Sequence, residues 1–194
     1  MPDLKLELQY LGKVIAGVDE VGMGPLAGPV VASAVIVDQN NIIPGIKDSK
    51  KLTPKMREYL YDKITEHYTW SVSLIDNDEI DQINIREAAK KACIMSVQKL
   101  GPNVEIVMVD GNMKFQDPRF ISIIKGDDLS VSIAASSIVA KVTRDRLMAE
   151  LAKEFPQYLW HKNSGYGTKE HLEAIKINGL SPYHRKSFKV RIDK

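Results

Sequence analysis

The feature that most constrains this chain is that three hydrophobic runs, each predicted to form a strand, end in acidic residues. The predicted strands cover 14–19, 105–111 and 120–128, and the acids at their ends are Asp19, Glu20, Asp110, Asp127 and Asp128. A single acid at a strand end is usually only solvated, but three can meet at the ligand-binding edge of an open α/β sheet. Gathered carboxylates repel one another unless cations lie between them, and oxygen ligands favour Mg²⁺ or Mn²⁺. The pattern therefore predicts a divalent-metal site, of the kind that hydrolyses phosphodiesters.

Adjacent strand residues point to opposite faces, so Asp19 and Glu20 share a site only if the chain leaves the pleat there. Gly22 and Gly24 follow directly and allow such a departure. The same glycines resemble a dinucleotide-binding fingerprint, which requires a helix to begin at this point. Two prolines bracket the turn and another strand follows, so that interpretation is rejected. A loop with free backbone N–H groups beside carboxylates remains, suited to hold a sugar or phosphate.

The remaining pattern predicts an α/β fold in one domain that spans 1–194. Strands at 14–19, 29–37 and 70–76 are expected to form an antiparallel meander. Helices are predicted at 53–68, 84–100 and 132–155, with shorter helical patterns at 168–178. In the first helix, Thr53 is the expected N-cap, Pro54 the first residue, and Met56, Leu60 and Ile64 one apolar face. The tail, about 156–194, is expected to pack on the sheet as an extension.

Composition excludes several classes of protein. The one cysteine, Cys93, rules out an intramolecular disulfide framework and a cysteine-rich zinc site, and its helical context predicts a buried structural thiol. The formal charge of +2 neither demands nor excludes a polyanionic partner. The N-terminal segment lacks the apolar run of a signal peptide, and no run is long enough to span a bilayer. We therefore expect a soluble, cytoplasmic protein with no membrane partner.

Several motifs resemble those of ribonuclease HII, and they occur in that family's order. They are "GVDEVGMGPLAGPVVASAVIV", "DSKKLT", "EIDQINIREA", "VDG", "KGDDLSVSIAASSIVAKVTRD", "SGYGTKEH" and "HRKSF", from residue 14 to about 188. The resemblance implies a ribonuclease H-like fold, with a mixed five-stranded sheet flanked by helices and a C-terminal helical extension. It also implies a monomer that cleaves the RNA strand of RNA–DNA hybrids, and DNA on the 5′ side of an embedded ribonucleotide.

The resemblance assigns catalysis and metal binding to Asp19, Glu20, Asp110 and Asp127. The resemblance further implies that these acids hold two Mg²⁺ or Mn²⁺ ions, and that hydrolysis there leaves a 3′-hydroxyl and a 5′-phosphate. Asp128 lies where the family varies, and we interpret it as a helix-capping or solvated acid. The related ribonuclease HIII carries an extra N-terminal domain, and the short segment before the first motif argues against it.

Other residues are candidates for contacts with the nucleic acid. On the helix 132–155, Ser137, Lys141 and Arg144 share one polar stripe, which is either a solvated face or a phosphate-binding one. The resemblance favours phosphate contacts by Lys141 and Arg144, and the further candidates are Lys50, Lys51, Gly22, Met23 and Gly24. Tyr166, between two glycines, is either a core tyrosine or a ring that stacks on a nucleotide. His171 and His184 are expected to be structural, and Arg185 and Lys186 to form a solvated face.

One residue departs from the family pattern. The glycine loop of the family is Gly-Arg-Gly, whereas here Met23 stands between Gly22 and Gly24. Backbone N–H contacts with a 2′-hydroxyl survive this change, but an arginine fork on a phosphate does not. Two other functions remain open on these residues. One is a hybrid-binding protein without turnover, against which the four acids argue, and the other is a metal-dependent DNase on the same fold.

Overall fold

The computed structural model describes residues 1–190, and its centre is a five-stranded sheet in the order β3-β2-β1-β4-β5. The strands are β1 (Ile15–Val21), β2 (Val30–Ile36), β3 (Thr69–Ile75), β4 (Ile106–Asp110) and β5 (Phe120–Ile123). The first three pair antiparallel, while β4 runs parallel to β1 and β5 parallel to β4. The predicted meander and the mixed sheet are confirmed.

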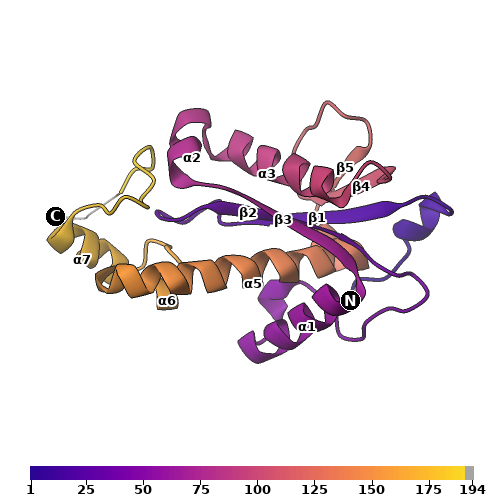
Figure 1. The fold of residues 1–194 in the computed structure, drawn as a ribbon, viewed down its shortest axis with the longest axis horizontal. Coiled ribbons are helices and arrows are strands. Elements are labelled where there is room, and N and C mark those ends of the chain that lie inside the picture. The colour runs from indigo at the N-terminus through magenta and orange to yellow at the C-terminus, as the bar shows by residue number, and fades with distance from the viewer. Residues whose placement is uncertain (191–194) are drawn as a thin grey trace.

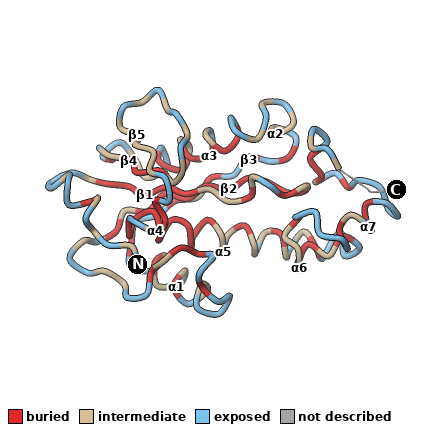
Figure 2. The backbone as a smooth tube through the Cα atoms, turned by 180° about the vertical axis from the view of Figure 1, so that it is seen from behind, coloured by how far each residue is buried: buried red, intermediate tan, exposed pale blue. Residues whose placement is uncertain are grey.

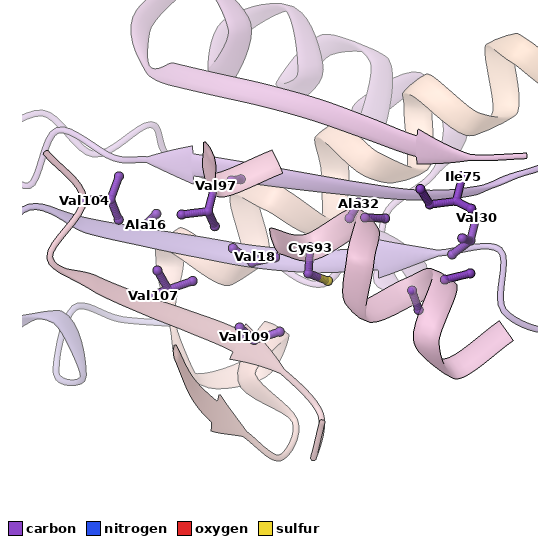
Figure 3. Close-up of a cluster of buried hydrophobic side chains, with 14 of the residues drawn as sticks. Ala16, Val18, Val30, Ala32, Ile75, Cys93, Val97, Val104, Val107 and Val109 are labelled. Atoms are coloured by element: carbon purple, nitrogen blue, oxygen red, sulfur yellow. The ribbon is translucent and has the colours of Figure 1, made fainter. Parts of the chain in front are cut away.

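Helices cover both faces of this sheet (Figure 1). The helices α2 (Asn77–Ile83) and α3 (Ile85–Leu100) lie on one face, and α5 (Val131–Glu154) lies on the other. The helix α2 is not among the helices predicted from the sequence. On the α3 face, Cys93 lies among buried valines and alanines of the sheet, as the helical context predicted (Figure 3).

Helix α5 lies against β1 because Gly17 has no side chain. A Cβ at this glycine would be 2.1 Å from the backbone carbon of Ser132, far closer than atoms approach. The N-terminal half of α5 is accordingly buried, as the red segment of the tube in Figure 2 shows. This close packing places the start of α5 under the strand that carries Asp19.

The helix α1 (Pro54–His67) packs on α5 and begins as predicted, with Thr53 accepting a hydrogen bond from the N–H of Met56. Leu60 and Ile64 are buried, but the side chain of Met56 is 45% exposed. Met56 lies one turn before Leu60 on the same face of α1, and it is the exposed end of that face.

The C-terminal segment packs on the last turns of α5 and on the loop after β1. Its end also contacts Asp81 of α2, and Phe188 packs against the core between the sheet and α3. It contains the 3₁₀ turn Pro156–Tyr158, α6 (Trp160–Asn163) and α7 (Lys169–Asn178). Tyr158 and Trp160 stack at 5.2 Å between ring centroids and share a core with Met148 and Ala27. Residues 191–194 of the predicted extension lie outside the described part of the chain. Within residues 1–190, no helix has the length and apolarity that a membrane crossing requires.

Candidate metal centre

Three carboxylates meet at the edge of the sheet where β1 and β4 end. Asp19, Asp110 and Asp127 each offer an oxygen, and these oxygens lie within 4.8 Å of one another. Asp19 comes from β1, and Asp110 is the last residue of β4. The predicted convergence of these three acids is thus present in the fold.

Asp127 reaches the cluster by a different route from the one predicted. The strand β5 ends at Ile123, and Lys125, with φ of 59°, turns the chain into the short helix α4 (Gly126–Leu129). The N–H of Gly126 donates to Oδ1 of Asp110 at 2.7 Å, which places Asp127 beside that carboxylate. The prediction that a strand covers 120–128 is therefore wrong, because a left-handed turn interrupts it.

Asp19 and Glu20 retain the alternation of a regular strand. Both residues pair in register with β2, and β1 continues to Val21, so the predicted departure from the pleat does not occur. Glu20 is nevertheless close to the cluster, since it lines one hollow with Asp110, so the two adjacent acids approach the same site without leaving the pleat. Asp19 is on the α5 side, where its N–H donates to the Oγ of Ser136 at 2.9 Å. Glu20 is outside the group of three, and its Oε2 is buried without a hydrogen-bond partner in residues 1–190.

Burial and mutual repulsion raise the pKa values of these acids. Burial, followed by the charges of Glu20 and Asp110, raises the pKa of Asp19 well above its usual range. Burial, followed by Asp110, raises the pKa of Glu20 to about 7. The cation that opposes this is Lys50, whose Nζ lies 3.7 Å from Oδ2 of Asp127. Crowded, partly desolvated carboxylates fit a site for hard divalent cations.

The two glycines of the opening loop serve different purposes. Gly22 has a φ of 97°, and a Cβ there would lie 2.3 Å from Nε of Arg144, so packing against that arginine requires glycine. At Gly24 a Cβ would meet only Cε1 of Tyr166, at an ordinary 3.5 Å. The ring of Tyr166 is 42% exposed, which argues against a core tyrosine. Gly24 and Tyr166 therefore lie next to each other at the surface.

Met23, which precedes Gly24 in the loop, lies beside two of the acids. Its half-buried side chain lines a hollow of about 540 Å³ together with Glu20 and Asp110. The hollow also contains Arg86, Lys90 and Lys114 from α3 and the loop after β4. A side chain at position 23 can thus reach both solvent and the edge of the acidic cluster.

The predicted stripe of Ser137, Lys141 and Arg144 is not a surface feature. Ser137 is buried and its Oγ accepts from the N–H of Ser49, while Lys141 pairs with Asp145 at 2.7 Å. Arg144 is fully buried, so the expected phosphate contact is contradicted. The three residues do lie on one side of α5, as the helical period predicts, but neighbouring segments of the chain cover this side.

The neighbouring lysines differ from each other. Lys50 is exposed and is near Asp127, whereas Lys51 forms an ion pair with Asp128. Asp128 is 40% exposed, in agreement with the interpretation of a solvated acid. Ser137 holds the backbone just before both lysines, which gives it a structural role in this region.

Sequence reasoning missed Arg185, which was expected on a solvated face. It is 1% exposed, and its guanidinium donates to the carbonyl oxygens of Gly22, Met23 and Gly28 at 2.6, 3.1 and 2.9 Å. No local pattern indicates this burial, since the acceptors lie more than 150 residues away in the chain. His171 and His184 are buried in contact with each other, consistent with the structural role predicted for them.

Comparison with known proteins shows what this chain is similar to. The family model described as Ribonuclease HII matches residues 16–191. Ribonuclease HII of Rickettsia bellii (strain OSU 85-389) is 68% identical over 185 residues, which are 95% of this chain and 94% of that protein. Among solved structures, RNase HII of Archaeoglobus fulgidus in its PCNA complex has a TM-score of 0.79 at 27% identity, covering 93% of this chain and 98% of that one. Ribonuclease H2 of Pyrococcus horikoshii OT3 has a TM-score of 0.76 at 29% identity, covering 91% and 94%.

Proposed function

The chain belongs to the ribonuclease HII family, and we propose that it hydrolyses its substrate with two divalent ions held by Asp19, Glu20, Asp110 and Asp127. As a member of this family the protein is a hydrolase that cleaves the RNA strand of RNA–DNA hybrids. We further propose that it cuts on the 5′ side of single ribonucleotides in duplex DNA and leaves 3′-hydroxyl and 5′-phosphate ends. The observation that carries the metal-dependent hydrolysis is the convergence of three carboxylates from β1, β4 and α4.

The donor set supports Mg²⁺ or Mn²⁺ as the ions. Asp19, Asp110 and Asp127 supply oxygens at one point, and Glu20 has a buried oxygen without a partner in residues 1–190. Bound to these acids, a pair of divalent ions would supply a lowered pKa of a bound water and stabilisation of the leaving oxygen of a phosphodiester. The chain's own contribution is to fix these carboxylates before metal binds. The Gly126–Asp110 hydrogen bond and the packing of Gly17 on α5 both serve that purpose.

Substrate selection is assigned to the surface beside the acids. The N–H groups of Met23 and Gly24 donate to no acceptor in the described part of the chain, so they are available to a 2′-hydroxyl or phosphate. The ring of Tyr166, next to Gly24, is placed to stack on the nucleotide at the cleavage point. Lys50 is exposed near Asp127 and is suited to contact a backbone phosphate. These residues act together on a monomer, in which all four acids come from one chain.

A gel assay with three labelled duplexes tests the proposal. The substrates are an RNA–DNA hybrid, a DNA duplex with one ribonucleotide, and an all-DNA duplex of the same sequence, each with Mg²⁺, with Mn²⁺ or with a chelator. We expect metal-dependent cleavage of the first two, with ligatable 5′-phosphate ends, and none of the third. Binding without cleavage would instead support a hybrid-binding protein, and cutting of the third duplex would support a DNase. Elution of the active species at the mass of a dimer would contradict the monomer.

A further inference from the structure

The loop between β1 and β2 is held from within by two arginines from distant parts of the chain. Arg144 of α5 donates to the carbonyl oxygens of Ala27 and Pro29 at 3.1 and 2.9 Å. Arg185 donates to the carbonyls of Gly22, Met23 and Gly28, and its own N–H donates to Leu26. Six of the eight carbonyls of residues 22–29 are therefore bound on the protein side of the loop.

Both guanidinium groups are buried without a carboxylate partner. Arg144 and Arg185 are 0% and 1% exposed, and neither forms an ion pair within residues 1–190. Burial lowers the pKa of Arg144 to about 10 and that of Arg185 to about 9, so both remain charged at neutral pH. A buried charge is costly unless hydrogen bonds compensate it, and arginine offers five donors in a fixed plane. The loop carbonyls supply that compensation, and in return their direction is fixed.

The same contacts join the glycine loop to the loop that carries Tyr166. Arg144 also donates to the carbonyl of Ser164 at 2.8 Å, and the N–H of Leu26 donates to the carbonyl of Gly165 at 2.8 Å. Tyr166 directly follows Ser164 and Gly165 in the chain, so the same hydrogen bonds hold its loop and the glycine loop together. The position of the ring against Gly24 thus depends on the two arginines.

We propose that Arg144 and Arg185 are positioning residues that bind the loop carbonyls inward, so that the N–H groups of Met23 and Gly24 face the nucleic acid next to Tyr166. This inference rests on the proposed function of that surface. Neither arginine is one of the residues proposed to bind metal. We therefore expect their replacement to affect substrate binding and not metal binding. The arginines also explain Gly22, whose missing side chain makes room for the Arg144 guanidinium.

The test compares Arg185→Ala, Arg185→Lys and Arg144→Lys with Arg119→Ala as control, because Arg119 is a half-exposed arginine paired with Asp117. Binding of a DNA duplex with one ribonucleotide is measured by fluorescence anisotropy in Ca²⁺, and Mn²⁺ binding by calorimetry without duplex. We expect Arg185→Ala to weaken duplex binding by about tenfold or more, with Mn²⁺ affinity changed less than about twofold. Added guanidinium should restore part of the binding, whereas the same concentration of sodium chloride should weaken it. The lysine variants should lie between, because lysine replaces a fork by one point donor.

Equal losses of duplex and Mn²⁺ binding, or unchanged duplex binding in a folded variant, would overturn the inference. Hydrogen exchange of the wild-type protein is a second test that does not depend on any variant folding. The amides of Met23 and Gly24 should exchange rapidly in the free protein and become protected by the duplex. Slow exchange of these amides without duplex would also overturn it. The binding measurements and hydrogen exchange do not require turnover. Absence of cleavage by the wild-type protein would therefore contradict the proposed function without deciding this inference.

Discussion

The N–H of Gly126 donates a 2.7 Å hydrogen bond to Oδ1 of Asp110, and this contact joins the helix α4 to the end of β4. Asp127 follows Gly126 directly, so the bond fixes two acids of the cluster relative to each other. A Cβ at Gly126 would lie 2.6 Å from Cδ1 of Ile133, which leaves little room for a larger residue. The position of Asp127 therefore depends on a tight turn rather than on the sheet.

Asp127→Asn is expected to abolish cleavage, while Asp128→Asn retains it. Asp127 lies within the carboxylate group, whereas the neighbouring Asp128 is paired with Lys51 outside it. Asp19→Asn and Asp110→Asn should behave like Asp127→Asn, with hybrid binding kept or tightened because repulsion of the phosphates falls. Turnover is measured in a gel assay and binding in Ca²⁺. An acid variant that keeps more than about a tenth of wild-type turnover, a loss under about 1.4 kcal/mol, contradicts the assignment.

Local patterns in the sequence predict the sheet meander, the main helices and the acids, because these depend on periodicity and capping. The N-cap Thr53 and the strand that contains Asp19 are examples. The burial of Arg144 and Arg185 could not be predicted this way, since their acceptors come from other parts of the chain. Gly22 shows the same limit. The sequence explains this glycine by a departure of the chain from the pleat, whereas in the structure it is required by a side chain from α5.

Glu7→Ala should destabilise the protein by about 2–3 kcal/mol, although the sequence analysis assigned Glu7 no role. The buried Oε1 of Glu7 accepts hydrogen bonds from the hydroxyl and N–H of Ser132 and from the hydroxyl of Ser130, at the start of α5. Its removal leaves these buried donors without an acceptor. Glu7→Gln should lose less, because an amide oxygen can still accept. Urea unfolding measures the change, and Glu66→Ala, at an exposed ion pair, should stay within about 0.5 kcal/mol of wild type.

The His184–His171 contact should make stability depend on pH. The N–H of Ser181 donates to Nδ1 of His184, so the proton of His184 is on Nε2 and points to Nε2 of His171. Burial lowers the pKa of His184 from 6.5 to about 4. Between these values the unfolded chain binds a proton that the folded chain does not, so this contribution to stability is lost as pH falls from about 6.5 to about 4.

The acidic cluster has the opposite effect, because its raised pKa values lower stability as pH rises. The contribution of His184 is therefore measured as the difference in unfolding free energy between wild type and His184→Gln. We expect this difference to shrink steadily as pH falls from about 6.5 to about 4. A difference that stays constant over this range would show that His184 titrates normally in the folded protein.

Tyr166→Ala should severely reduce cleavage at a single embedded ribonucleotide without changing the fold. The ring is partly exposed beside Gly24, and its stacking on a nucleotide would use the ring face. Tyr166→Phe should therefore recover much of the activity. Activity and melting temperature are measured for both variants. Equal losses for Ala and Phe, or a fall in melting temperature that accounts for the lost activity, would assign the ring to packing instead.

Met23→Arg should tighten binding to a DNA–RNA–DNA duplex, because an arginine can add a charge-assisted contact to a phosphate. Such a contact contributes roughly 1.5–3 kcal/mol when well made, and it should steepen the salt dependence of binding by about one phosphate. The side chain of Met23 lines the hollow beside Glu20, so an arginine has an open path to the substrate. The metal requirement and the cleavage position should not change.

The competing outcome for position 23 follows from its partial burial. If Met23 serves mainly as packing against the core under α3, arginine will lower the melting temperature and weaken binding. An arginine that turns toward Glu20 would instead lower the Mn²⁺ affinity, since it would pair with a carboxylate of the proposed metal site. Duplex affinity at two salt concentrations, Mn²⁺ affinity and thermal stability separate these cases, with Met23→Leu as the uncharged control. Unchanged affinity with an unchanged salt slope would contradict a substrate contact at this position.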